Sequence, residues 1–129
     1  MLFDDLNDSL ERNKADCLDA LVTLVPKPSI SSNDTAVREC AVLLLDMLRQ
    51  AGLDAELCET GGRPLIYAQH IVASQLPTIL FYGHYDVVPA EPIEEWHSAP
   101  FQPEVRDGKI FGRGRWTPLF GQPDGWAKL

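Results

Sequence analysis

The sequence predicts an α/β domain, because two segments with helical periodicity are followed by several short segments with strand-like patterns. An α+β arrangement would use the same order of elements and is the alternative at this level. With 129 residues, the chain has the length of one domain with one core. Its hydrophobic fraction of 45% and charged fraction of 23% are ordinary for a globular domain. They exclude a disordered tail, a collagen-like repeat and a coiled coil.

Two helices are expected in the amino-terminal half. Leucines recur near helical spacing through residues 4–25, and Pro26 ends that pattern. After a connector rich in Pro and Ser, a second helix is expected to begin with Asn33 or Asp34 as its cap. One apolar face runs along this helix, and Gly52 is placed to end it.

The pattern changes to strands after the second helix. Residues 53–57 alternate between apolar and polar, and residues 65–71 read as the next strand. Residues 78–82 are continuously apolar, which is typical of a central strand buried on both faces. Residues 105–111 predict a hairpin with Asp107 and Gly108 at its turn. We therefore expect two amino-terminal helices followed by strands of a mixed sheet.

A His-x-Asp triplet, His84-Tyr85-Asp86, follows the apolar segment directly. Ligand sites in α/β sheets favour the carboxyl ends of strands, and residues i and i+2 of a strand point to the same side. The imidazole and the carboxylate can therefore meet, which suits a metal-bound histidine whose second ring nitrogen donates to a carboxylate. The same triplet also occurs as a surface or structural hydrogen bond, so it carries little weight alone.

The residues around the triplet add several motifs in order: Gly83–Pro89, Trp96, Pro100–Pro103 and Arg106–Gly114. Together with the two preceding helices, they strongly resemble the dinuclear-zinc amidohydrolase and exopeptidase family. That family includes carnosine-type dipeptidases, aminoacylases, glutamate carboxypeptidases and succinyl-diaminopimelate desuccinylase. The resemblance covers about residues 6–114 and implies the partial catalytic domain of a zinc exopeptidase.

The resemblance implies a role for two residues. His84 corresponds to a ligand of one zinc ion, and Asp86 to the catalytic-site carboxylate that orients this histidine. An intact family site holds two zinc ions, with cobalt or manganese as alternative metals, and hydrolyses a small peptide or an N-acyl amino acid with a metal-activated water. Because only one ligand is matched, we expect at most one weak zinc site in this chain.

The resemblance stops at Gly114. In the family, an aspartate that bridges both zinc ions follows, whereas residues 115–118 here read Arg-Trp-Thr-Pro without a carboxylate. The general-base glutamate and the remaining ligands are likewise unmatched. We expect residues 1–114 to be the amino-terminal part of a metallopeptidase catalytic domain, and residues 115–129 to be a non-family tail that is frame-shifted or fused.

Three functional hypotheses follow. The first is an amino-terminal fragment of a zinc-dependent dipeptidase or N-acyl amino-acid amidohydrolase, inactive as this chain alone. The second is a non-catalytic relic or an interaction module that associates with an intact homologue. The third is a generic α/β binding domain. An uncovered sheet surface would also favour self-association.

Composition limits the partners and the location. The net charge of −8 does not suit a nucleic acid or an anionic membrane, so neither is expected as a partner. No apolar run approaches the roughly 18 residues of a membrane span. Three cysteines without metal or disulfide spacing, and a start unlike a secretory signal, predict a cytoplasmic location. His70 and His97 match no ligand position of the family and are expected to be structural or exposed.

Overall fold

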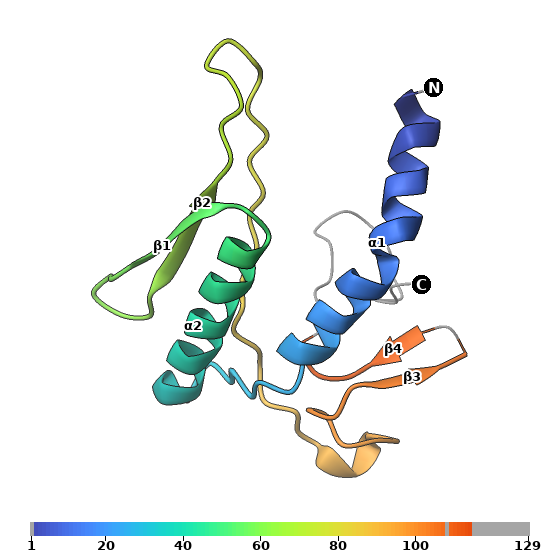
Figure 1. Ribbon diagram of the computed structural model, residues 1–129. Coiled ribbons are helices and arrows are strands. Elements are labelled where there is room, and N and C mark those ends of the chain that lie inside the picture. Colours follow the sequence, from blue (N-terminus) through green and yellow to red (C-terminus); the bar gives the residue numbers. More distant parts are fainter. Residues whose placement is uncertain (1, 108, 115–129) are drawn as a thin grey trace.

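The computed structural model describes residues 2–107 and 109–114. Two helices come first, and short strands with one 3₁₀ turn follow them, as the sequence predicts (Figure 1). The elements are α1 (Leu2–Leu24), α2 (Asp34–Gln50), β1 (Asp54–Cys58), β2 (Leu65–Gln69), η1 (Ile93–Glu95), β3 (Glu104–Arg106) and β4 (Lys109–Phe111). Helix α2 packs against the β1–β2 hairpin and also contacts α1.

Both ends of α2 follow from local chemistry. The Asn33 side chain caps the helix by accepting a hydrogen bond from the Ala36 amide at 3.1 Å, which satisfies one of the free N–H groups of the first turn. At the other end, Gly52 has a φ of +86°, a left-handed conformation that glycine adopts without strain. The predicted cap and the predicted end are both confirmed.

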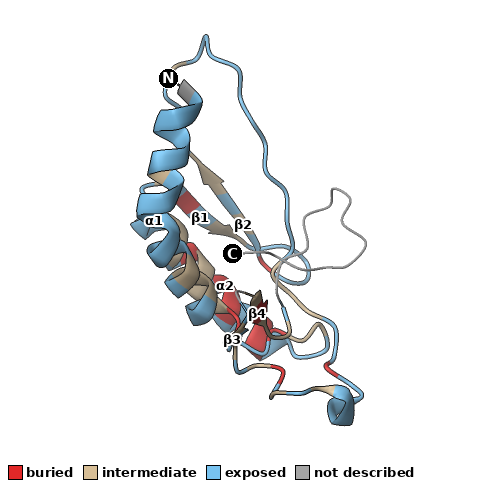
Figure 2. Cartoon of the chain, turned by 90° about the vertical axis from the view of Figure 1, so that its right-hand side faces the viewer, coloured by how far each residue is buried: buried red, intermediate tan, exposed pale blue. Residues whose placement is uncertain are grey.

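Helix α1 is mostly exposed. The predicted helix is present and ends just before Pro26, but its apolar side chains near the start are uncovered, with Phe3 78% exposed. Only its carboxyl end meets the rest of the described structure, where Val25 is buried. Figure 2 shows the helix in pale blue along most of its length.

The described strands form two antiparallel pairs. Strands β1 and β2 pair from Asp54↔Gln69 to Cys58↔Leu65, and β3 pairs with β4 through a turn in which Asp107 has a φ of +51°. The predicted hairpin at residues 105–111 is therefore confirmed, and the two strands predicted after the second helix are present as β1 and β2. The expected mixed sheet is represented within residues 2–107 and 109–114 by these two separate sheets and by one parallel bridge between Ile30 and Val87.

The expectation of a central strand at residues 78–82 is wrong for the described structure. The segment has no strand pairing, and its side chains from Ile79 to Tyr82 are 76–88% exposed. A strand requires a neighbour that satisfies its N–H and C=O groups, and no described residue takes that place. The apolar pattern thus identifies a segment suited to burial, although nothing described here buries it (Figure 2).

The buried core is small and centres on the contact between α2 and β1. Most of its side chains are small, so little apolar area leaves water at each position. The buried apolar residues are Val25, Ala36, Val37, Cys40, Ala41, Leu45, Ala55, Ala90 and Ile110. Among the described helices, none is long and apolar enough to cross a membrane.

Candidate functional site

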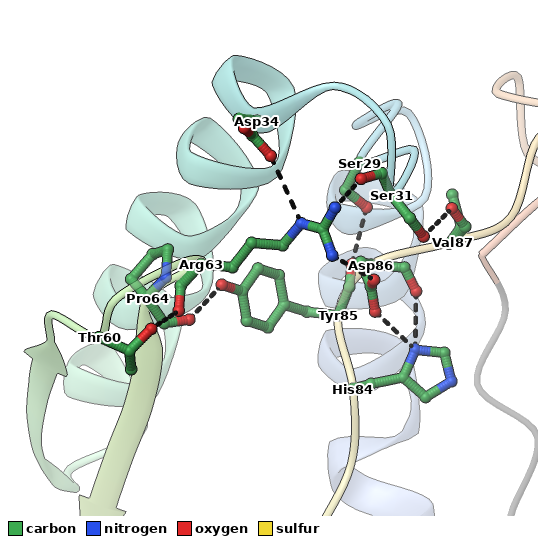
Figure 3. Close-up of polar contacts among 10 residues, drawn as sticks. All are labelled: Ser29, Ser31, Asp34, Thr60, Arg63, Pro64, His84, Tyr85, Asp86 and Val87. Atoms are coloured by element: carbon green, nitrogen blue, oxygen red, sulfur yellow. Dashed lines mark hydrogen bonds and ion pairs between the residues drawn. The ribbon is translucent and has the colours of Figure 1, made fainter.

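His84 and Asp86 are in contact, as their spacing predicts (Figure 3). The His84 Nδ1 atom lies 2.7 Å from the Asp86 backbone carbonyl oxygen and 3.1 Å from Asp86 Oδ1. A carbonyl oxygen only accepts hydrogen bonds, so Nδ1 carries the proton and donates. In the neutral imidazole the lone pair then resides on Nε2. The His84 side chain is 74% exposed and that of Asp86 is 29% exposed, so the ring projects from a half-buried carboxylate.

The backbone around this pair is held by the connector between the two helices. Val87 donates its amide to the Ser29 carbonyl at 2.8 Å and accepts from the Ser31 amide at 2.8 Å, which forms the parallel bridge at Ile30. The hydroxyls of the same two serines make two further hydrogen bonds to this segment. Ser29 Oγ donates to the Tyr85 carbonyl at 2.7 Å, and Ser31 Oγ donates to the Val87 carbonyl at 3.0 Å. The segment after His84 is therefore fixed although the segment before it is not paired.

The β1–β2 turn reaches the same segment from the other side. The Arg63 guanidinium pairs with Asp86, with Nη1 3.7 Å from Oδ2, and with Asp34, with Nε 3.6 Å from Oδ1. Arg63 Nη2 also donates to the Ser31 carbonyl. The turn itself is stabilised by the Thr60 hydroxyl, which donates to the Arg63 carbonyl at 2.7 Å. A single side chain thus joins the turn, the start of α2, the connector and the Asp86 carboxylate.

Tyr85 points away from His84 and fastens the segment to the hairpin. Its hydroxyl donates to the Pro64 carbonyl, as Figure 3 shows. Burial raises the pKa of Tyr85, and the neighbouring Cys40 and Asp86 add to this effect. The phenol therefore stays protonated and keeps its role as a donor. Burial likewise raises the pKa of the Cys40 thiol, which lies beneath the Tyr85 carbonyl.

Two other histidines and Trp96 lie outside this arrangement. His70 and His97 are exposed, as expected. Trp96 packs the loop: its Nε1 donates to the Ala90 carbonyl at 2.8 Å, and the Arg113 guanidinium lies 4.9 Å from its ring centre.

Three residues that hold the site were not predicted. Ser29 and Ser31 lie in the connector rich in Pro and Ser, and the residues that their hydroxyls contact are distant in sequence. Arg63 lies in a glycine-containing turn and gave no signal, because its partners are distant in sequence.

The donor set at this site fits one ligand of a zinc ion. Nε2 of a neutral imidazole is a preferred zinc donor, and a carboxylate on the opposite ring nitrogen is the usual support for such a ligand. Within the described parts of the chain, no group of three or more His, Cys, Asp or Glu side chains is arranged to hold a metal ion. The described residues thus bring together one imidazole and one carboxylate at this site.

Comparison with known proteins places this pair in a family context. The model of peptidase family M20/M25/M40 matches residues 80–117, which include His84 and Asp86. The chain is 36% identical over 100 residues to the succinyl-diaminopimelate desuccinylase of Methylococcus capsulatus, covering 78% of this chain and 25% of the relative. The M20 family metallo-carboxypeptidase Sso-CP2 from Sulfolobus solfataricus matches with a TM-score of 0.70 and 38% identity, over 75% of this chain and 22% of that structure. This chain resembles the amino-terminal part of peptidase M20 family members.

The M20 match concerns the amino-terminal part of the family's catalytic domain. The di-peptidase Dug1p of Saccharomyces cerevisiae also superimposes, with a TM-score of 0.73 and 25% identity over 83% of this chain and 26% of that structure. The chain spans about a quarter of the length of the curated relatives it matches. These similarities confirm the expected family and the partial α/β catalytic domain. The predicted tail at residues 115–129 lies outside the described residues.

Proposed function

We propose that this chain is the amino-terminal part of a zinc-dependent M20 hydrolase of the dipeptidase or N-acyl amino-acid amidohydrolase type. His84 binds one zinc ion through Nε2, and Asp86 orients the ring. The observation that carries this proposal is the donation from His84 Nδ1 to Asp86, which leaves the Nε2 lone pair free on an exposed ring. A zinc ion held at His84, with cobalt or manganese as alternatives, would polarise a scissile carbonyl and lower the pKa of a bound water.

By itself, this stretch of 129 residues is proposed to be inactive. A catalytic zinc ion needs about three protein ligands in addition to water. Residues 2–107 and 109–114 bring together one histidine and its supporting carboxylate, so at most one weak metal site is expected. Hydrolysis then requires ligands from residues outside this described part or from another chain.

The substrate class is proposed from the relatives. Their names describe a desuccinylase, a metallo-carboxypeptidase and a di-peptidase, so a small peptide or an N-acyl amino acid is the proposed substrate of the complete enzyme. A cytoplasmic location is proposed on the basis of three free cysteines, since a reducing compartment keeps such thiols reduced.

Zinc competition with a chromophoric chelator tests the ligand assignment. We expect His84→Gln to abolish specific zinc binding, and Asp86→Asn to weaken it about 10–100-fold because the ring loses its orienting carboxylate. His97→Gln, which removes an exposed histidine outside the site, is the matched control and should bind like the wild type. Zinc affinity that is unchanged in His84→Gln would remove the assignment.

Hydrolysis assays test the proposed inactivity. Dipeptides, N-acetyl amino acids and an N-succinyl amino acid should remain intact with the zinc-loaded chain. Turnover by the purified chain that disappears in His84→Gln would show that the chain is a complete enzyme, and would contradict the proposed inactivity.

A second candidate function, self-association, is favoured by one observation. The four consecutive apolar residues 79–82 are largely exposed and unpaired within the described structure, and an unpaired strand edge is a template for another chain. Sedimentation velocity should show association that increases with concentration and is weakened by Leu80→Lys with Phe81→Lys. Phe3→Lys, on the exposed face of α1, is the control. A wild-type chain that stays monomeric at every concentration would contradict the proposed self-association.

A further inference from the structure

We propose that Arg63 is a positioning residue that sets the orientation of the Asp86 carboxylate and, through it, the tautomer and direction of the His84 ring. The proposal rests on the proposed function only where it assigns a metal to His84. The contacts within the protein are independent of that assignment.

The carboxylate of Asp86 is shared between two partners. Oδ1 lies 3.1 Å from His84 Nδ1, and Oδ2 lies 3.7 Å from Arg63 Nη1. Each partner takes one oxygen, so the rotation of the carboxylate about its terminal bond depends on both. Among the described residues, the Asp86 side chain has no further hydrogen bond or ion pair. Without Arg63, only the exposed imidazole would remain to hold it.

Arg63 is able to set that rotation because its own orientation is fixed at two other points. Its Nε faces Asp34 at the start of α2, and its Nη2 donates to the Ser31 carbonyl. The guanidinium is planar and its N–H directions are rigid, so two anchored nitrogens determine where the third one points. The third nitrogen is the one that faces Asp86 (Figure 3).

The contact matters because the imidazole has little else to hold it. The His84 side chain is 74% exposed, and its two hydrogen bonds both go to Asp86. One of these uses the backbone carbonyl, which the connector fixes through Tyr85 and Val87. The other uses the side chain, and this is the contact that Arg63 controls.

The competing interpretation is that Arg63 only fastens the β1–β2 turn to the rest of the fold. The chain contains a contact of that kind for comparison. Arg38 on α2 makes a bidentate pair with Glu59, with Nη1–Oε1 at 2.6 Å and Nη2–Oε2 at 3.0 Å, at the same end of the hairpin. This pair touches neither His84 nor Asp86, so Arg38→Gln is a matched control that removes a hairpin contact and leaves the site alone.

The test is the ring ¹⁵N spectrum of His84 in the zinc-free, full-length chain, at a pH where the imidazole is neutral. The resonances are assigned by their loss in His84→Gln. We expect the wild type to show mainly the Nδ1–H tautomer, and Arg63→Gln to shift the population toward Nε2–H. Arg38→Gln should match the wild type. Ring shifts that are unchanged in Arg63→Gln, or that move equally in Arg38→Gln, would overturn the proposal.

Two milder variants keep the test informative if Arg63→Gln fails to fold. Arg63→Lys keeps the positive charge without the planar fork, and Asp34→Asn weakens one anchor of Arg63 without touching the site. Both should give tautomer populations between those of the wild type and of a chain without the contact. Wild-type populations in both variants would overturn the proposal.

Zinc affinity separates this inference from the proposed function. Arg63→Gln should bind zinc about 10-fold more weakly than the wild type, as loss of support around a ligand does, while Arg38→Gln should bind equally well. A wild-type chain that binds no zinc would contradict the proposed function and leave the tautomer result standing. An unchanged tautomer with intact zinc binding would contradict the role of Arg63 alone.

Discussion

Replacing Ser29 with alanine tests the anchor that holds the candidate site. Ser29 is 2% exposed, and its hydroxyl donates to the Tyr85 carbonyl at 2.7 Å. Among the described residues, this carbonyl in Ser29→Ala keeps only the thiol of Cys40, whose sulfur is 3.9 Å away. The variant loses a hydrogen bond and leaves a part-buried acceptor poorly satisfied, which costs about 1–3 kcal/mol. We expect the free energy of unfolding to fall by about 2 kcal/mol.

The measurement is urea unfolding followed by far-ultraviolet circular dichroism, supported by thermal unfolding. For a domain of this size, 2 kcal/mol corresponds to a decrease in Tm of roughly 8 °C. Ser32→Ala is the matched control, because Ser32 lies in the same connector, is exposed, and has no side-chain hydrogen bond within the described residues. It should change the free energy by less than about 0.5 kcal/mol. Equal stabilities of the two variants would refute the reasoning.

Three further outcomes are expected. Val37→Ala, at a fully buried position of α2, should lower the free energy of unfolding by about 2 kcal/mol through lost burial and a residual cavity, seen as a lower urea midpoint. The hydrogen bond from Arg38 lowers the pKa of Glu59, so its stabilisation is complete above the ordinary pKa of a glutamate and is lost as the pH falls through the lowered folded-state pKa. Glu59→Gln should therefore reduce Tm near neutral pH but not at a pH low enough to protonate Glu59 in the folded chain, and equal deficits at both would contradict the pairing. In iodoacetamide labelling read by mass spectrometry, exposed Cys17 should react first and buried Cys40, whose pKa burial raises, only after unfolding; comparable rates in the folded chain would argue against that burial.

Elements with local signals were predictable from the sequence. The start of α2 depends on one side chain and one amide three residues apart, and its end depends on a glycine that takes a positive φ. The two hairpins likewise join neighbouring segments. In each case the sequence window contains all the groups that decide the structure.

The segment at residues 78–82 shows where such reasoning fails. Its composition indicates suitability for burial, but strand formation is a property of a pair of segments. No window of sequence contains the partner, and no described residue supplies it. The prediction of a central strand therefore used the composition of one segment and lacked the pairing partner that a strand also requires.

The contacts of the candidate site also include one that local sequence spacing predicts and others that it does not. Contact between His84 and Asp86 follows from a spacing of two residues, which the sequence displays. The contact of Arg63 with Ser31 joins residues 32 positions apart, and that of Ser29 with Tyr85 joins residues 56 positions apart. These supports depend on how the connector, the hairpin and the site segment meet in space, so sequence alone gave no indication of them.

The bridge between the connector and the site segment also has a consequence for the order of folding. Joining residues 56 positions apart costs loop-closure entropy of about 3–4 kcal/mol before its hydrogen bonds compensate, whereas the β1–β2 hairpin closes a short turn. We expect the hairpin to form early and the surroundings of His84 to be completed last. In pulse-labelled hydrogen exchange during refolding, the Val87 amide, which donates to Ser29, should gain protection after the amides of β1 and β2. Earlier protection of Val87 would contradict this order; the expected order would make the candidate metal ligand a sensitive reporter of complete folding.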